Sequence, residues 1–450
     1  MAIAGLGACD DRLVVVGGGL AGCEAAWQAA RRGVDVTLYE MRPERRSPAH
    51  TGDALAELVC SNSLRADRFA NAVGLLKEEM RRLGSLILEA ADVTRVPAGR
   101  ALAVDRRAFS AEITERIETH PRIELRREPV DEIPSAPQAI LATGPLTSAE
   151  LTRALQKLLG DEHLYFYDAI APTVYGDSID PTVAFSASRW EDGPGDYLNL
   201  PLSEEEYRAF VAALSAADTV PLHAFEAALY FEGCLPVEEM ARRGLDTLAY
   251  GPLKPVGLVD PRSGRRPHAV VQLRREDREG VLYNLVGFQT KLRVGEQRRV
   301  FGALPGLSKA VFARFGSVHR NTYVNAPRRL TPSLEVACRP GLRLAGQMAG
   351  VEGYVESAAL GLLAGVHAAR ALRGRPPLLP DPQTAHGALM RHLTAGDPAH
   401  FQPSNITYGL FPPLEGDGRR IRKREKQERL AVRALDALEA WRPAWDEDVA

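Results

Sequence analysis

The chain has 450 residues, 45% of them hydrophobic and 25% charged, with a formal net charge of -2. This length suits two or three domains, and these averages exclude a globally disordered chain. No run approaches the roughly 18 uninterrupted apolar residues of a membrane-spanning helix. The first eleven residues lack a basic start and lead directly into an apolar strand, so we expect a cytoplasmic protein with no membrane partner.

Residues 12–40 predict one βαβ unit, with a strand at 13–16, a glycine turn at 17–22, an alanine-rich helix and a second strand at 34–40. The turn has the spacing Gly-x-Gly-x-x-Gly between the strand and the helix, which is the dinucleotide-binding fingerprint in its proper context. The alternative is a purely structural βαβ unit. The fingerprint predicts cofactor contacts at Gly17, Gly18, Gly19, Leu20, Ala21 and Gly22.

Each glycine of the fingerprint has a physical reason. Gly17 permits a tight turn, Gly19 lets the backbone approach a pyrophosphate, and Gly22 lets the helix touch the strand. The first N–H groups of the helix face the anion. Glu40, 18 residues after Gly22 at the end of the second strand, is placed to accept hydrogen bonds from ribose hydroxyls.

The rest of the chain contains several further segments with a recognisable pattern. Residues 139–144 predict a short buried strand that ends in a glycine turn. Residues 171–284 alternate short apolar runs with Pro and Gly, as an inserted α+β domain does. Residues 341–346, 347–353 and 356–369 repeat strand, turn and helix and should rejoin the first domain. A Pro-rich linker at 374–382 and an amphipathic charged helix at 419–441 follow.

Two of these segments favour FAD over NAD as the dinucleotide. The late strand-turn-helix resembles the segment by which glutathione-reductase-type flavoproteins hold the ribityl-phosphate end, and residues 142–144 resemble their middle contact. This resemblance implies contacts at Gly144, Gly346 and Gln347, the last standing where many relatives have Asp. Only one fingerprint is present, so NAD(P)H, if used, should bind transiently. We expect an α/β protein with a glutathione-reductase-like FAD-binding Rossmann fold and an inserted α+β domain.

The predicted domain boundaries follow from these segments. The first part of the FAD-binding domain covers residues 10–170, and the insertion covers residues 171–284. The second part of the FAD-binding domain covers residues 285–370, and a C-terminal helical segment covers residues 371–450.

Five cysteines, at positions 9, 23, 60, 234 and 338, are widely spaced and include no C-x-x-C pair, so neither a disulfide framework nor a metal site is indicated. Cys60 opens a polar stretch, where Arg65 is near enough in sequence to favour a thiolate. Cys234 lies between Gly233 and Pro236 in a loop-like setting. A free cysteine is more often a small core residue, and that alternative stays open for both.

Seven stretches in order along the chain resemble the folate- and FAD-dependent tRNA uracil-5-methyltransferases: residues 14–22, 39–43, 60–65, 232–236, 286–292, 319–323 and 401–413. The resemblance implies that methylenetetrahydrofolate donates a one-carbon unit to a T-loop uridine of tRNA, giving ribothymidine, with reduced FAD as reductant and methylene carrier and NADH or NADPH as electron source. It also implies that Cys60 and Cys234 act as nucleophile and base, without deciding which does which.

The tRNA contact is less defined. The resemblance makes His319 a candidate for stacking a pterin ring, although a lone histidine more often satisfies a local hydrogen bond. The run that contains Arg419, Arg420 and Arg422 is a candidate phosphate-binding surface. Interleaved acidic residues favour the alternative of an ordinary solvated helix with i,i+4 pairs.

Three other functions stay open from sequence. One is the longer FAD family that modifies wobble uridines of tRNA, which carries a substantial C-terminal helical extension. The second is a general FAD oxidoreductase that needs no tRNA, and the third is a flavin-binding module with no catalysis.

Overall fold

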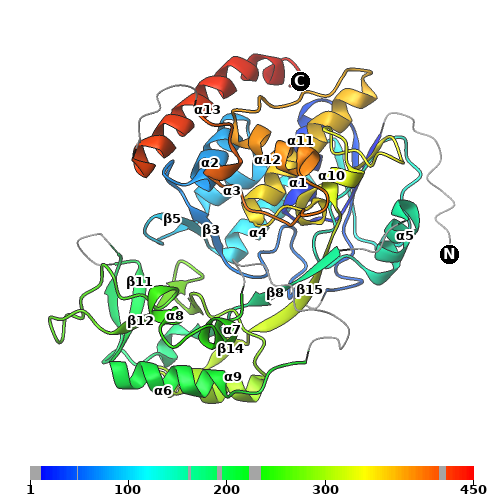
Figure 1. The fold of residues 1–450 in the computed structure, drawn as a ribbon. Coiled ribbons are helices and arrows are strands. Elements are labelled where there is room, and N and C mark those ends of the chain that lie inside the picture. Colours follow the sequence, from blue (N-terminus) through cyan, green and yellow to red (C-terminus); the bar gives the residue numbers. More distant parts are fainter. Residues whose placement is uncertain are drawn as a thin grey trace.

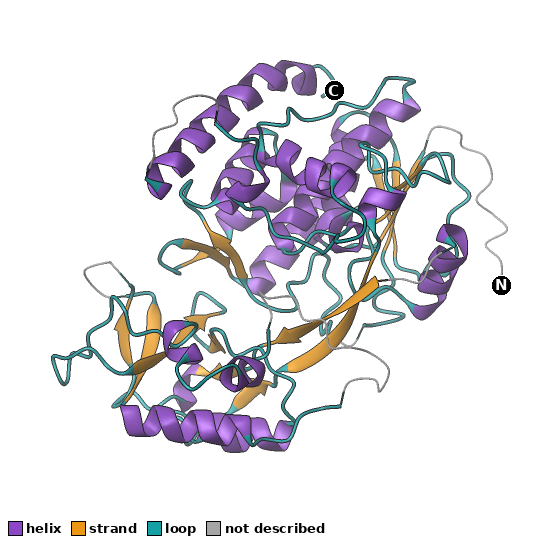
Figure 2. Ribbon diagram, viewed as in Figure 1, coloured by secondary structure: helices purple, strands orange, loops and turns teal. Residues whose placement is uncertain are grey.

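The computed structural model describes residues 12–47, 49–160, 164–189, 195–221, 235–414 and 422–449. Its elements form two groups, joined by a long antiparallel ribbon of two strands (Figure 1). Most of the helices gather in the upper group, whereas the lower group contains the larger antiparallel sheet (Figure 2).

A parallel sheet of five strands forms the centre of the upper group. In spatial order the strands are β16 (Leu342–Leu344), β7 (Ala139–Leu141), β1 (Leu13–Val16), β2 (Val36–Tyr39) and β6 (Ile123–Arg126). Every residue of β16, β7, β1 and β2 is buried, as in a parallel sheet whose faces are covered. The predicted strands at 13–16, 34–40, 139–144 and 341–346 therefore all contribute to one sheet, as expected for the Rossmann fold.

Two helices pack closely against each other beside this sheet. They are α1 (Leu20–Arg31) and α11 (Tyr354–Leu372). A Cβ on Gly361 would lie 2.1 Å from the carbonyl oxygen of Ala21, so the backbones touch through glycine. Among the described residues α11 is the helix long and apolar enough to cross a membrane, but 83% of that stretch is buried, as in a core helix.

The remaining elements of the upper group surround this core. A small antiparallel sheet has the order β3 (Ser63–Ala66), β5 (Ala101–Val104) and β4 (Arg95–Val96). The other helices are α2 (Ala72–Arg82), α3 (Leu86–Val93), α4 (Arg106–Thr119), α5 (Ala149–Leu159), α10 (Ala326–Arg329), α12 (Ala385–Ala395) and α13 (Lys423–Asp446), with short 3₁₀ turns η3 (Gly346–Ala349) and η4 (Tyr408–Leu410).

The C-terminal segment packs into the hydrophobic core of the upper group. Leu430, Leu438 and Trp445 of α13 are buried in that core. The Trp445 indole donates to the Leu83 carbonyl at 3.3 Å, and the Arg32 guanidinium lies 4.3 Å from the centre of the Trp445 ring. These contacts explain why the helix predicted to end near residue 441 continues to Asp446.

The lower group is the inserted α+β unit. Its sheet has the order β10 (Phe185–Ala187), β11 (Tyr197–Leu202), β12 (Ala269–Arg275), β13 (Leu282–Leu285), β9 (Thr173–Tyr175) and β14 (Phe312–Arg314), and its pairs are antiparallel. Its helices are α6 (Glu204–Ser215), α7 (Val237–Arg242), α8 (Thr247–Tyr250) and α9 (Val294–Gly302), with the 3₁₀ turn η1 (Gly176–Ser178). The ribbon that joins it to the upper group pairs β8 (Leu164–Ile170) with β15 (Ser317–Tyr323).

We propose that the insertion extends beyond the predicted boundary at residue 284. Its apolar core continues past residue 284 through Phe288, Phe301 and Leu307, and β14 pairs with β9 at its start. Helix α9 and strand β14 therefore pack with the insertion, because Phe301 of α9 contacts Phe288, α9 contacts α6, and β14 pairs with β9. We accordingly propose Arg314, rather than residue 284, as the end of this unit.

Candidate active site

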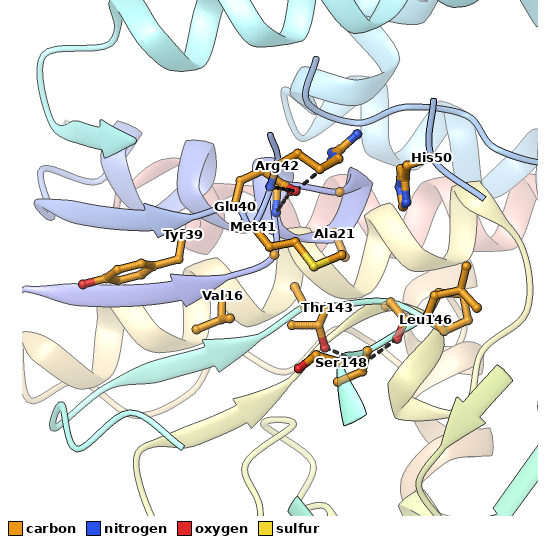
Figure 3. Close-up of a pocket in the computed structure, with 18 of the residues that line it drawn as sticks. Val16, Ala21, Tyr39, Glu40, Met41, Arg42, His50, Thr143, Leu146 and Ser148 are labelled. Atoms are coloured by element: carbon orange, nitrogen blue, oxygen red, sulfur yellow. Dashed lines mark hydrogen bonds and ion pairs between the residues drawn. The ribbon is translucent and has the colours of Figure 1, made fainter. Parts of the chain in front are cut away.

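A pocket opens at the carboxyl ends of β1, β2, β7 and β16, where the glycine turn meets the start of α1. Its walls come from the turn 17–21, from residues 39–42 after β2, from residues 142–148 after β7, and from Gly346, Gln347, Tyr354 and Ser357. Glu40, Met41 and Arg42 lie on one wall, and Thr143 and Ser148 lie on the other (Figure 3). Parallel α/β sheets bind ligands at this edge.

The glycines of the turn are required for different reasons. A Cβ on Gly22 would lie 1.8 Å from the Gly17 carbonyl oxygen, so Gly22 allows helix and strand to touch. Gly17 has φ +106°, and a Cβ there would lie 2.5 Å from the Ala142 carbonyl oxygen. Around Gly19 no described atom lies within 4 Å of such a Cβ, so its backbone faces open space beside the N-terminus of α1. This is the cradle that a pyrophosphate requires.

Glu40 organises the wall after β2. Its carboxylate accepts hydrogen bonds from the backbone N–H of Gly18 at 2.9 Å, from the backbone N–H of Arg42 at 3.0 Å and from the Arg42 Nε at 2.7 Å. Burial raises the pKa of Glu40, but the hydrogen bonds and charge of Arg42 outweigh it and hold the pKa below its ordinary value. A carboxylate offers about four acceptor sites, so one stays available for a ribose hydroxyl.

The opposite wall is shaped by turns that require left-handed backbone. Gly144 has φ +69° and Gly346 has φ +76°, and both line the pocket. Gln347 also lines it, and its side-chain amide donates to the Glu352 carboxylate at 2.7 Å. The predicted contacts therefore come together around one pocket, apart from Gly22, which packs behind it.

Cys60 lies next to this pocket and is tied to its wall. Tyr354, at the start of α11, lines the pocket, and its hydroxyl oxygen accepts hydrogen bonds from the backbone N–H groups of Cys60 at 2.7 Å and Ser61 at 3.2 Å. Burial, followed by the proximity of Cys60, raises the pKa of Tyr354, so its phenol stays protonated. Cys60 itself is half-buried and free.

Three arginines hold the same segment of chain, which we call the Cys60 segment (residues 58–62). The guanidinium of Arg106, from α4, donates to the carbonyls of Leu58 and Cys60. Arg274, from β12, donates to the Asn62 side-chain oxygen at 2.9 Å and to the Ser61 hydroxyl at 2.6 Å. Arg314, from β14, donates to the Val59 carbonyl at 2.8 Å. The insertion therefore supplies two of the three arginines.

The charge around the Cys60 segment is unbalanced. The Glu276 carboxylate accepts a hydrogen bond from Arg106 at 2.6 Å. Within the described part of the chain, it is the carboxylate that forms an ion pair with one of these three arginines. Burial lowers the pKa of Arg274 and of Arg314. Even so, a guanidinium stays protonated, so the segment is surrounded by net positive charge.

The sequence missed these arginines and assigned Arg65 their role. Arg65 pairs instead with the Glu356 carboxylate and the Asn405 side chain, and its backbone has φ +63°. Arg106, Arg274 and Arg314 stand 46 to 254 residues from Cys60 in sequence. Among the pocket residues, Arg42 lies within the stretch 39–43 and so had a local sequence signal. No pattern in the sequence pointed to Tyr354.

Several predicted residues lie outside what the structure describes. Cys234, Arg419 and Arg420 are outside the described residues, and of His319 the structure gives the backbone, which pairs with Asp168 between β15 and β8. Arg422 stands at the N-cap position of α13, where its side chain makes no capping hydrogen bond. Cys23 is fully buried with its pKa raised by burial, and Cys338 is exposed. Across the described ranges no group of three or more His, Cys, Asp or Glu side chains is placed to hold a metal.

The chain is similar to known proteins over nearly its whole length. The family described as "Glucose inhibited division protein A" matches residues 12–376. "Methylenetetrahydrofolate--tRNA-(uracil-5-)-methyltransferase TrmFO" of Geobacter sulfurreducens is 60% identical over 430 residues, covering 95% of this chain and 98% of that protein. The protein of the same name from Desulforudis audaxviator is 59% identical, again covering 95% and 98%.

Among solved structures, GidA of Aquifex aeolicus superposes with a TM-score of 0.68 at 17% sequence identity. The match covers 96% of this chain and 74% of that chain. At this identity the likeness shows the fold, which is the expected FAD-binding Rossmann type.

Proposed function

Because the chain belongs to the "Glucose inhibited division protein A" family and, within it, to the methylenetetrahydrofolate--tRNA-(uracil-5-)-methyltransferases, we propose how its residues perform that family's reaction. The protein is an enzyme that methylates carbon 5 of uracil in tRNA, with methylenetetrahydrofolate as one-carbon donor and FAD as cofactor. The target we propose is a T-loop uridine, which becomes ribothymidine.

FAD fits the pocket described above. The open backbone at Gly19 and the N-terminus of α1 would hold the pyrophosphate, Glu40 would accept the ribose hydroxyls, and Gly144, Gly346 and Gln347 would line the ribityl end. When bound there, FAD supplies electrons and carries the methylene group. We propose that NADH or NADPH reduces it during a transient visit, since the sequence contains one dinucleotide fingerprint.

The chemistry of the base requires two groups from the chain. Carbon 5 of uracil is a poor nucleophile until a thiolate adds to carbon 6 and pushes electron density onto carbon 5 and the carbonyl oxygen. After carbon 5 has bonded to the methylene carbon, a base removes the carbon 5 proton and the bond from the methylene carbon to its carrier breaks. A hydride equivalent, which bound FAD would supply, then completes the methyl group as the thiolate leaves carbon 6. We assign these two roles to Cys60 and Cys234, with the order open. The net positive charge around the Cys60 segment favours the negative charge that the base acquires.

One observation carries this proposal: a single hydrogen-bonding group, the Tyr354 hydroxyl, joins the Cys60 segment to the wall of the dinucleotide pocket. A nucleophile placed there lies beside the cofactor. A T-loop base is tucked into folded RNA, so the enzyme must turn it out to reach this place.

The direct experiment incubates the protein with isotopically labelled methylenetetrahydrofolate, NAD(P)H and unmodified tRNA. Label should enter ribothymidine in the T-loop. Label at a wobble uridine would support the alternative wobble-modifying function, and NAD(P)H oxidation indifferent to tRNA and folate would support a general oxidoreductase.

A second experiment assigns the cysteines. tRNA that contains 5-fluorouridine should form a covalent complex, because fluorine at carbon 5 blocks removal of the proton. Peptide mapping identifies the attached cysteine. If neither Cys60→Ala nor Cys234→Ala changes trapping or turnover, both assignments are wrong.

We further propose a cytoplasmic location, where tRNA is available. The contact surface for tRNA suggested by sequence, at Arg419, Arg420 and Arg422, stays a candidate. The described part of that region favours the alternative of an ordinary charged helix, because Arg424 pairs with Glu428 and Arg429 with Glu425.

A further inference from the structure

One segment of the insertion combines exposed apolar side chains with a strong excess of positive charge. Residues 242–266 contain six basic and two acidic residues, a net charge of +4. The basic residues, all exposed, are Arg242, Arg243, Lys254, Arg262, Arg265 and Arg266. By contrast, residues 422–449 around α13 contain seven basic and seven acidic residues and have no net charge.

Aromatic and aliphatic side chains project from the same segment. Tyr250, at the end of α8, is 85% exposed, more than any other large apolar side chain of the described residues. Leu245, Val256 and Val259 are exposed as well. Single exposed apolar residues are ordinary, but four within fifteen residues, interleaved with basic ones, form a patch.

The segment is held firmly from beneath, so these side chains are presented on a fixed support. Leu248, Leu253 and Leu258 are buried in the core of the insertion. The Tyr207 hydroxyl donates to the Leu245 carbonyl at 2.8 Å and accepts from the Ala249 N–H at 3.0 Å. Ordering of the segment therefore adds little to the entropy lost when a partner binds.

The segment also packs on one of the sequence stretches shared with the methyltransferase family. A Cβ on Gly287, in the stretch 286–292, would lie 2.4 Å from the Pro252 side chain, so only glycine fits. The next residue but one in that stretch, Gln289, accepts from the N–H of Val237 at the start of α7. In Figure 1, α7 and α8 lie above α6, the helix at the lower edge of the insertion.

Exposed aromatic rings set among cations are what unpaired nucleotides bind. Each base offers a face that stacks on an aromatic ring, and the neighbouring phosphates pair with Lys and Arg. The centre of a protein–protein interface usually has fewer charged residues than this patch. We propose that residues 242–266, with Tyr250 as the stacking residue and Lys254, Arg265 and Arg266 as phosphate contacts, form a tRNA-binding surface of this enzyme. The proposal rests on the function proposed above.

The test measures the dissociation constant for unmodified tRNA over a range of salt concentrations, using the full-length FAD-loaded protein. Tyr250→Ala should raise this constant about five- to one-hundred-fold, because stacking contributes roughly 1–3 kcal/mol per base. Tyr250→Phe, which keeps the ring, should bind as the wild type does. FAD content and melting temperature should be unchanged in both.

A charge-matched pair of variants tests the phosphate contacts. The triple variant Lys254→Gln, Arg265→Gln, Arg266→Gln should lower the slope of log K against log salt by about two, since each lost phosphate contact removes roughly 0.7–0.9. The control removes the same charge from α13, as Lys423→Gln, Arg424→Gln, Arg429→Gln, and should leave affinity and slope unchanged.

The surface proposal is overturned if the insertion variants bind tRNA as the wild type does, or if the α13 control lowers the slope equally. Wild-type protein that methylates tRNA while the insertion variants bind normally would leave the proposed function intact and remove only this surface. Wild-type protein that neither binds nor methylates tRNA would remove both.

Discussion

The dinucleotide pocket and the Cys60 segment lie side by side, but they are built in different ways. The pocket is formed by backbone at the ends of neighbouring strands, with glycine wherever a side chain would block the turn. The Cys60 segment is held by guanidinium groups from α4, β12 and β14, which are distant in sequence. The phosphate-binding turn can thus be made by one short motif, whereas the Cys60 segment depends on contacts from distant parts of the chain.

Loss of Gly22 should have the largest effect, because it removes both regions at once. In Gly22→Ala the added Cβ would lie 1.8 Å from the Gly17 carbonyl oxygen, so α1 must move away from β1. We expect a loss of stability on the order of 4 kcal/mol or more and a colourless protein. Denaturant unfolding and the flavin absorbance measure these. Gly19→Ala, where no described atom lies within 4 Å, should fold with wild-type stability.

Loss of Arg274 should impair catalysis while leaving cofactor binding intact. Arg274→Gln removes charged hydrogen bonds to Ser61 and Asn62, each contributing about 1.5–3 kcal/mol. We expect kcat for tRNA methylation to fall roughly ten- to one-hundred-fold while FAD content stays at the wild-type level. Arg275→Gln, whose guanidinium instead donates to the Tyr283 hydroxyl, is the matched control. Equal losses in the two variants would contradict a specific role for Arg274.

Glu40 should stabilise the pocket in a pH-dependent way. Its pKa in the folded protein lies below the unfolded value, so its contribution is present above the unfolded pKa and is lost as the pH falls through the folded pKa. Glu40→Gln should therefore cost on the order of 2 kcal/mol of unfolding free energy at pH 7. The difference from wild type should shrink below about pH 4. Glu44→Gln, at an exposed neighbour, is the control and should leave the unfolding free energy at pH 7 unchanged.

Tyr354→Phe should have the smallest effect. The ring still lines the pocket, but the Cys60 and Ser61 N–H groups lose their acceptor. We expect FAD binding to persist and kcat to fall on the order of tenfold. Steady-state kinetics at saturating tRNA would measure this, and unchanged turnover would show that the hydroxyl does not position Cys60.

Much of the fold could be predicted because its signals are local. The strand 13–16, the glycine turn and Glu40 stand in one short stretch, and hydrophobic period, glycine spacing and strand ends identify them directly. The end of the insertion could not be placed from the sequence. Tertiary contacts decide whether Phe288 and Phe301 pack in the core of the insertion or in the core of the FAD-binding domain. The arginines of the Cys60 segment were missed for the same reason, since no spacing along the chain records their meeting.

The central claim is that the pocket holds the cofactor while Cys60 acts on the base. Cys60→Ala tests it most directly, with bound FAD and label transfer from methylenetetrahydrofolate into tRNA measured on one preparation. The account predicts wild-type FAD content together with a loss of transfer of at least about 100-fold. Transfer at the wild-type rate in a FAD-loaded Cys60→Ala protein would contradict it.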